Sequence, residues 1–355
     1  MTTAVTRRAA TDRAVCARRT VEDLLQRVRH RLASSLAAER AHYAEVHEHA
    51  VVAVDALADL AAAGGPLLRP AFCLTGYLAA GGDPEEAGIV DAAAALELLH
   101  LSTLVHGDVL DGSRTRRGKP AVHVLHSTLH RTRGWHGESR RFGEGVAVVA
   151  GDLALVYADE LMAGAPRGAR TQWRRLRPEA VIGPYLDLAA AAESSAAPDL
   201  PRLTALLTSG RRAVRGPLVL GASAAGRPDL TGALAHYGEA VGEAFQLRGD
   251  LLDAFGDPAH TGATAGRHFP RHKVTLLLGR AMQRDSRLRD LITEPGHTPD
   301  EIRARLLDTG VTADAEQRIA HLVDQGCAAL VDAPLQPQWR ARLTDMALRA
   351  AYRDK

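Results

Sequence analysis

Two pairs of aspartates with the same spacing stand far apart in this chain of 355 residues. Asp108 and Asp111 are three positions apart, and so are Asp250 and Asp253. Because residues i and i+3 lie on nearly the same face of a helix, each pair would present its carboxylates side by side. Buried carboxylates are costly unless they are paired or bind a metal, and such oxygen ligands suit Mg²⁺, which also coordinates water and phosphate. The four aspartates are therefore candidate magnesium ligands and candidate catalytic residues.

A basic segment follows the first pair directly and contains Arg114, Arg116, Arg117 and Lys119. The planar guanidinium of arginine can bind two phosphate oxygens at once. Acidic pairs beside an arginine-rich segment are typical of a site that binds a diphosphate together with Mg²⁺. A single pair of aspartates could equally cap a helix end, but two pairs with related flanking residues are far more specific.

The elements that must position these residues are predicted to be helices. Aromatic residues make up only 4% of the chain, and Ala and Leu, which favour helices, are abundant. Apolar residues recur at helical spacing, and the main predicted helices are 51–65, 85–111, 143–165, 178–195, 230–257, 299–309, 313–332 and 337–352. The segment 112–142, rich in Arg, His and Gly, is predicted to be a loop. We expect 85–111 and 230–257 to face each other, so that Asp111 and Asp253 approach across one cavity.

Composition narrows the class of protein further. The chain is 46% hydrophobic, which is ample for a sizeable core, and we expect a flexible tail over 1–18 followed by a single domain over 19–355. A net charge of +2 gives no general argument for binding nucleic acid or a membrane surface. The N-terminus lacks a secretory signal pattern, and we expect no apolar run that reaches the roughly 20 residues of a membrane-spanning helix. A cytoplasmic protein is expected.

Cysteines and histidines offer no second metal site. The three cysteines lie far apart in the sequence, at Cys16, Cys73 and Cys327, and are expected to be ordinary thiols. Histidines crowd the predicted loop at His123, His126, His130 and His136. Their spacing suits no zinc site, so we expect them to be solvated.

Longer stretches around both aspartate pairs resemble a known family. The segments 97–123 and 245–266 are similar to the two aspartate-rich regions of trans-polyprenyl diphosphate synthases, such as geranylgeranyl diphosphate synthases. Further similar segments are 64–70, 142–155, 183–188 and 216–226, so the resemblance extends over about 50–290 in the family's order. It implies an all-α isoprenoid-synthase fold, in which an antiparallel helix bundle surrounds a central cavity, and a protein that usually forms homodimers.

The resemblance also implies roles for individual residues. Arg69, His100 and Arg117 match the isopentenyl-diphosphate site of the family. Arg116 matches its allylic-diphosphate site, and Lys273 follows the second aspartate motif. The implied chemistry is electrostatic, because Mg²⁺ and cationic side chains stabilise the diphosphate that leaves as the allylic carbon–oxygen bond breaks.

The floor of the pocket for the prenyl tail is implied in the same way. Thr103 and Ser102 stand four and five residues before Gly107, which occupies the leading position of the first motif. Both side chains are small, and Leu99 lies one turn deeper, so the pocket would accept about fifteen to twenty carbons at ~1.5 Å of helix per residue. Alternatively, the two hydroxyls bond to backbone carbonyls of their own helix, and another side chain closes the pocket.

Both motifs depart from the family pattern Asp-Asp-x-x-Asp at their leading position. Gly107 and Gly249 stand where the family has the first aspartate. In the first motif the leading and last aspartates chelate together, so that Asp111 keeps a direct ligand position while the other three aspartates match supporting or weaker positions. We therefore expect fewer or more weakly bound Mg²⁺ ions than is usual for the family.

Three phosphate-binding lysines of the family are also replaced. The residues at these positions are Pro66, Thr208 and Ala263. Arg211 and Arg212 stand close to the second of them and could partly replace its charge. Each lost charge-assisted contact is worth ~1.5–3 kcal/mol, so the family activity cannot be transferred to this chain unchanged.

Three functions therefore remain open. The first is a prenyl diphosphate synthase with a reduced magnesium site, which takes an allylic prenyl diphosphate and isopentenyl diphosphate. The second is a non-catalytic or regulatory subunit that dimerises with an active paralogue. The third is a repurposed enzyme, either a terpene cyclase or a prenyltransferase to a different acceptor.

Overall fold

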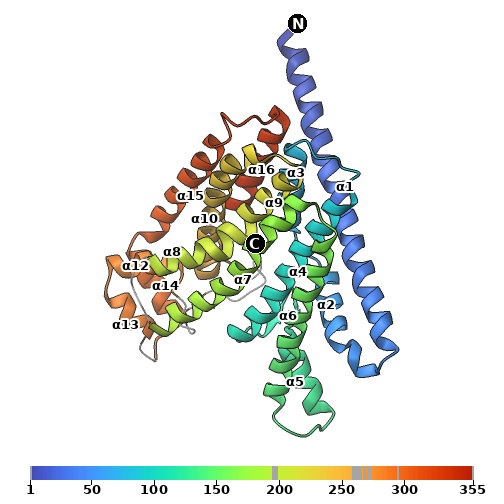
Figure 1. Cartoon of the computed structure of the whole chain (residues 1–355). Helices are drawn as coiled ribbons and strands as arrows, with labels where there is room; N and C mark the ends of the chain where they lie inside the picture. Colours follow the sequence, from blue (N-terminus) through green and yellow to red (C-terminus); the bar gives the residue numbers. More distant parts are fainter. Residues whose placement is uncertain are drawn as a thin grey trace.

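The computed structural model describes residues 2–193, 199–257, 266, 269, 274–293 and 296–353. Apart from two short strands, the regular structure of these residues is helical, which confirms the predicted all-α fold (Figure 1). The elements are α1 (Thr2–Ala44), η1 (Glu48–Val51), α2 (Val52–Ala62), α3 (Leu68–Ala79), α4 (Ala87–Leu110), β1 (Thr115–Arg116), β2 (Lys119–Pro120), α5 (Val122–Thr132), α6 (Ser139–Ala163), α7 (Arg167–Glu193), α8 (Asp199–Ala205), η2 (Leu206–Arg215), α9 (Gly216–Ala224), η3 (Pro228–Leu230), α10 (Thr231–Phe255), α12 (Leu276–Arg284), α13 (Arg287–Thr293), α14 (Pro299–Asp308), α15 (Val311–Ala328) and α16 (Pro337–Ala351).

Helix α4 is the core helix of the bundle and ends at the first aspartate motif. It packs against α1, α3, α6 and α7, and the side chains from Ala92 to Leu96 have no exposed surface. By length and composition alone α4 could cross a membrane, contrary to our expectation that no apolar run is long enough. However, 78% of its apolar window is buried inside the fold, so the helix serves as the apolar centre around which the others pack.

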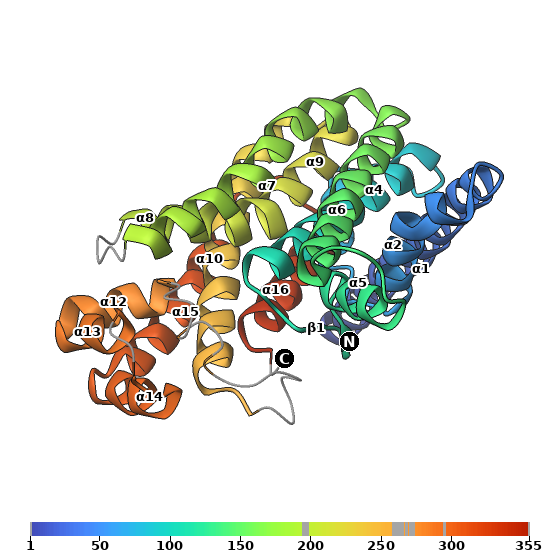
Figure 2. The ribbon, with the colours of Figure 1, turned by 90° about the horizontal axis from the view of Figure 1, so that it is seen from below.

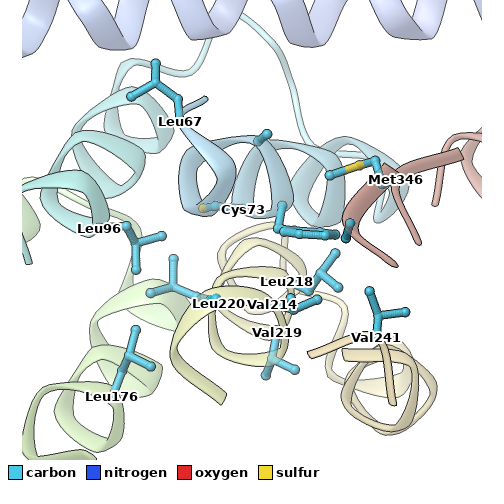
Figure 3. Packing of buried hydrophobic residues seen from close by; sticks show 14 of the residues in the cluster. Leu67, Cys73, Leu96, Leu176, Val214, Leu218, Val219, Leu220, Val241 and Met346 are labelled. Atoms are coloured by element: carbon cyan, nitrogen blue, oxygen red, sulfur yellow. The ribbon is translucent and has the colours of Figure 1, made fainter. Parts of the chain in front are cut away.

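The crossing of α3 and α9 brings two backbones into direct contact. A Cβ on Gly221 would collide with the carbonyl oxygen of Cys73, and one on Gly76 would collide with that of Leu218. Figure 3 shows Cys73 beside Leu218 and Leu220 in the apolar layer between these helices. Because interiors are close-packed, this contact fixes the start of α3 relative to the chain segment that leads into α9, and both carry side chains of the candidate site.

Helix α1 runs along one side of the molecule, and its first turns project beyond the bundle (Figure 1). Its backbone is helical from Thr2, where the sequence predicted a flexible tail over 1–18. From Ala17 onward one stripe of the helix is buried against the core. The buried residues of this stripe, at helical spacing, are Val21, Leu24, Val28, Leu32 and Leu36.

The segment 112–142 is more ordered than the predicted loop. Strands β1 and β2 form an antiparallel pair, and α5 follows them and packs on α6. The expectation of solvated histidines was wrong for three of the four, since His123, His126 and His130 lie on α5 with at most 9% of their surface exposed. A Cβ on Gly143 of α6 would collide with the carbonyl oxygen of His123. This glycine therefore allows the close approach of the helices that buries the histidines.

Candidate active site

A cavity of about 230 Å³ lies at the C-terminal end of α4. Asp111, at the end of α4, and Asp187 of α7 line it together with Arg212 of η2 and Gln246 of α10. Figure 2 views this part of the bundle from below, with α7 continuing towards α8 and with α10 and α12 beneath them. The bundle thus brings residues that are more than a hundred positions apart in the sequence around one space.

The two motif helices contribute differently to this cavity. The first motif contributes Asp111, as predicted, but Gln246 is the described lining residue from α10, in place of the predicted Asp253. Asp250, one turn beyond Gln246, is buried. It accepts hydrogen bonds from Nε2 of Gln246 at 2.6 Å and from the backbone N–H of Leu277 at 3.2 Å. Asp250 of the second motif is therefore held by donors of the protein itself.

Asp108 is paired with Arg116. Nε of Arg116 donates to both carboxylate oxygens of Asp108, at 3.0 and 3.2 Å, and its Nη2 also donates to Oδ1. Burial raises the pKa of the Asp108 carboxyl, while the hydrogen bonds from Arg116 oppose the shift. The predicted allylic-site arginine and one predicted magnesium ligand thus neutralise each other.

The predicted isopentenyl-diphosphate residues gather in one cationic cluster that includes a buried acid, Glu97. Nη2 of Arg117 lies 3.6 Å from Oε1 of Glu97. Burial lowers the pKa of Arg69 to about 10, with Glu97 opposing the shift and Arg117 adding to it. Burial, followed by the charges of Arg69 and Arg212, holds the pKa of His100 well below its usual range. His100 is consequently neutral at physiological pH, and its buried Nδ1 and Nε of Arg69 have no hydrogen-bond partner.

The backbone is strained on two sides of this cluster. Leu67 has φ +46° and Arg117 has φ +51°, in the left-handed region that non-glycine residues rarely adopt. A Cβ on Gly65 would lie 2.6 Å from Nη2 of Arg117. The absence of a side chain at Gly65 therefore leaves room for the arginine. Such strain is concentrated at functional sites, where the surrounding structure maintains it.

Arg212 is a site residue that our sequence-based assignment of binding residues omitted. It lines the cavity, and its Nε and Nη1 are buried without a partner, although part of the side chain is exposed. Burial lowers its pKa to about 9, and the charge of Arg69 adds to the shift. The one sequence signal was its position four residues after Thr208, which replaces a family lysine.

The two small residues expected beneath the prenyl tail differ in position. Thr103 lines the cavity, and its hydroxyl donates to the carbonyl oxygen of His100 at 2.8 Å. Ser102 is only 1% exposed and is not among the described residues that line the cavity. Leu99, one turn deeper, is also 1% exposed. Lys273, predicted to follow the second motif, lies outside the described residues.

The two glycines at the leading positions of the motifs have different surroundings. A Cβ on Gly107 would meet nothing within 4 Å, whereas one on Gly249 would lie 3.1 Å from Nη2 of Arg353. The guanidinium of Arg353 stacks 3.7 Å above the ring of Phe245. Burial lowers the pKa of Arg353 to about 10, with Arg248 adding to the shift and Asp250 opposing it.

Across the described ranges, no group of three or more His, Cys, Asp or Glu side chains is placed to hold a metal ion. The carboxylates that line the cavity are Asp111 and Asp187, and they suit an ion that is shared with a phosphate.

Comparison with known proteins agrees with the geometry. The family model described as polyprenyl synthetase matches residues 51–307. A short chain isoprenyl diphosphate synthase from Methanothermobacter thermautotrophicus is 31% identical over 240 residues, which is 64% of this chain and 66% of that protein. A geranylgeranyl diphosphate synthase from Mycobacterium tuberculosis is 34% identical over 61% of this chain and 58% of that protein. The alignments thus span less than two thirds of these relatives.

Solved structures match over more of the chain. The structure of a geranylgeranyl pyrophosphate synthase from Corynebacterium glutamicum, in complex with isoprenyl diphosphate and magnesium, covers 94% of this chain and 99% of its own. Its TM-score is 0.87 at 34% sequence identity. A polyprenyl synthase from Caulobacter crescentus, in complex with calcium and isoprenyl diphosphate, has a TM-score of 0.80 at 26% identity and covers 96% of this chain and 98% of its own.

Proposed function

The chain belongs to the polyprenyl synthetase family, and from this premise we propose that it is a prenyltransferase acting on an allylic diphosphate of about fifteen to twenty carbons. Isopentenyl diphosphate is its proposed second substrate. The observation that carries the proposal is the convergence of Arg69, His100 and Arg117 on one buried cluster beside the cavity of Asp111. Arg69 and His100 each have a buried nitrogen without a partner, whereas Arg117 donates to the carbonyl oxygen of Leu60 and lies against Glu97. A diphosphate group suits this set of cationic and unpartnered side chains.

Each part of the site has a proposed task. The guanidinium groups of Arg69 and Arg117 bind the diphosphate of isopentenyl diphosphate, and neutral His100 contributes a hydrogen bond. Asp111 and Asp187 would hold Mg²⁺ together with the allylic diphosphate. When bound there, Mg²⁺ would stabilise the charge of the departing diphosphate. We propose fewer or weaker ions than is usual for the family, because Asp108 is engaged with Arg116.

A second function is favoured by the way in which arginines of the protein lie against its own acidic residues. Arg116 neutralises Asp108, and Arg353 lies beside Gly249 and Asp250. A bundle whose acidic groups are already matched by its own arginines can persist without metal or substrate. It would serve as a non-catalytic or regulatory subunit that dimerises with an active relative. Neither a terpene cyclase nor a transferase to another acceptor is among the relatives named above, so the third reading gains no support from them.

One incubation separates these functions. The purified full chain is mixed with Mg²⁺ and farnesyl diphosphate, with and without isopentenyl diphosphate. A longer prenyl diphosphate that forms only when isopentenyl diphosphate is present supports the synthase. A hydrocarbon or alcohol formed without isopentenyl diphosphate supports a cyclase. A folded protein with no product in either mixture supports the partner subunit.

The assembly and location of the protein are further parts of the proposal. We propose a single domain over 19–355, and a homodimer or a heterodimer with a paralogue, in the cytoplasm and without nucleic acid. Sedimentation of the full chain, alone and mixed with an active relative from the same cell, tests the assembly. A chain that stays monomeric in both samples contradicts it.

A further inference from the structure

The segment that presents Arg212 is a π-helix. η2 spans Leu206–Arg215, and the residues that flank it, Ala205 and Gly216, have ordinary α-helical dihedrals. The chain therefore continues from α8 through η2 into α9 as one rod with a widened central part. π-helical turns are rare and are concentrated at functional sites, because the extra residue redirects the side chains around it.

Contact with α10 holds η2 in place. A Cβ on Gly242 of α10 would collide with Cα of Gly210 in η2, and one on Gly238 would lie 2.5 Å from Cα of Arg215. The backbones of the two helices thus meet at both ends of the arginine-bearing turn. This close packing of the two backbones restricts how η2 can lie against α10.

The two neighbouring arginines on this turn point to different partners. Arg211 donates from Nη1 to Oε1 of Glu179 on α7, at 3.0 Å. Arg212 lines the cavity with Asp111 and Asp187, and its Nε and Nη1 are buried without a partner. Buried donors without acceptors are costly to the fold. Arg212 thus combines two buried nitrogens that have no acceptor with a place in the cavity lining, which indicates that a ligand supplies the missing acceptor.

The charge around Arg212 specifies the kind of ligand. The charge of Arg69 contributes to the lowered pKa of Arg212, and Arg69, Arg212 and Arg117 together lower the pKa of His100. Glu97 is the buried acid of this cluster, and Arg117 already lies 3.6 Å from it. In the part of the chain that the structure describes, neither Arg69 nor Arg212 forms a salt bridge, whereas Arg117 has Glu97. An anion with many oxygens in two linked groups matches these two cations, since each arginine can bind two oxygens.

We propose that Arg212 is a direct ligand of a substrate diphosphate, and that with it the cationic cluster binds a diphosphate without a metal ion. The family lysine at position 208 is absent here, and the π-helical turn supplies a cation four residues later instead. This proposal rests on the proposed function only for the chemical class of the ligand. It concerns binding, and it does not require that the protein convert the ligand to a product.

The test is calorimetric titration of the full chain with inorganic pyrophosphate in excess EDTA. The parent should bind, and Arg212→Met should bind about tenfold more weakly or worse, because a charge-assisted contact is lost. Arg212→Lys should recover part of the affinity. The matched control is Arg211→Gln, one residue away, which removes the pair with Glu179 and should leave pyrophosphate affinity within about twofold of the parent.

Folding is followed separately, because Arg212→Met also removes a buried unpaired charge. Its melting temperature should equal or exceed that of the parent, so that weaker binding cannot be ascribed to unfolding. Parent-like binding of pyrophosphate by Arg212→Met overturns the proposal, as does an equal loss in Arg211→Gln. Absence of binding by the parent in EDTA overturns the metal-free part.

A parallel titration with farnesyl diphosphate distinguishes a substrate headgroup from a free anion. The same loss in Arg212→Met supports a substrate ligand, whereas a loss confined to inorganic pyrophosphate contradicts it. If the parent binds through Arg212 but forms no product with isopentenyl diphosphate, the proposed synthase activity fails and this inference stands. If the parent forms a product but Arg212→Met binds pyrophosphate as tightly as the parent, this inference fails and the proposed synthase activity stands.

Discussion

Nη2 of Arg353 lies 3.1 Å from the point at which a Cβ on Gly249 would stand. Arg353 is held there by Phe245, over whose ring it stacks. The residues near the end of α16 thus place a guanidinium beside the leading position of the second aspartate motif, where the resemblance implied a carboxylate. A cation of the protein itself therefore lies next to Gly249.

Restoring the second leading aspartate should therefore create an ion pair before it creates a metal ligand. In Gly249→Asp the new carboxylate is expected to pair with Arg353, and Mg²⁺ affinity in the presence of pyrophosphate should stay near that of the parent. The double variant Gly249→Asp with Arg353→Met should bind Mg²⁺ about tenfold more tightly, because the competing cation is gone. Calorimetry measures both. Equal gains in the single and double variants would show that Arg353 does not compete.

Restoring the first leading aspartate should act without a second change. A side chain at Gly107 has open space, since nothing lies within 4 Å of its Cβ. In Gly107→Asp the new carboxylate lies one helical turn before Asp111, so the two can chelate one ion. Mg²⁺ affinity with pyrophosphate present should rise about tenfold. No rise would mean that the end of α4 is not directed at a metal position.

Removal of Arg116 should lower the free energy of unfolding, because the buried carboxylate of Asp108 loses its partner. Arg116→Gln leaves Asp108, which is 3% exposed, without its guanidinium. We expect a loss of ~1–3 kcal/mol in the free energy of unfolding at neutral pH. Urea unfolding of the parent and the variant measures this difference.

The pair of Arg116 and Asp108 also predicts how the stability of Arg116→Gln changes with pH. Burial already raises the pKa of Asp108 against the pull of Arg116, so removal of Arg116 raises it further. The folded state then binds a proton more readily than the unfolded state, and stability falls as pH rises through the raised pKa. The deficit of Arg116→Gln should therefore grow from about pH 4 to pH 7. Adding Asp108→Asn should remove this dependence, and a deficit independent of pH in Arg116→Gln alone would refute the assignment.

Thr103 and Ser102 should respond differently to the same aromatic replacement. Thr103→Phe places a ring in the cavity and should weaken farnesyl diphosphate binding or shorten any product. Ser102→Phe forces a ring into a position that is 1% exposed, and overpacking should cost ~1–3 kcal/mol of stability. Thr103→Ser, which keeps a hydroxyl for the bond to His100, is the control. Unchanged tail binding in Thr103→Phe would show that this face of α4 does not line the tail pocket.

The long helices were predictable because their signals are local. The predicted 85–111 and 230–257 correspond to Ala87–Leu110 and Thr231–Phe255, since apolar spacing and flanking glycines and prolines act within a few residues. Helix α5 was missed because its buried residues include His123, His126 and His130. Their burial depends on Gly143 of another helix, which the local pattern does not reveal.

The family resemblance supplied residues that lie together in the structure, but it did not reveal contacts that depend on other parts of the fold. The cluster of Arg69, His100 and Arg117 was assigned before the structure, and the three residues do converge. Arg212 needs the widened turn of η2 to reach the cavity, and Arg353 meets Gly249 from 104 positions away. Neither the register of a π-helix nor a contact between distant segments can be read from the spacing of residues.

The π-helical segment η2 also suggests how such a site could arise or be lost during evolution. A π-turn accommodates an extra residue within a rod whose flanks are α-helical, so it can preserve the record of a single-codon insertion. Deletion of one residue between 206 and 211 would restore an α-helix and turn the following side chains by roughly 100° relative to the preceding ones. Arg212 would leave the cavity although no side chain in it had been exchanged. Insertion or deletion of one residue in η2 could therefore change ligand preference as readily as substitution of a residue in the cavity.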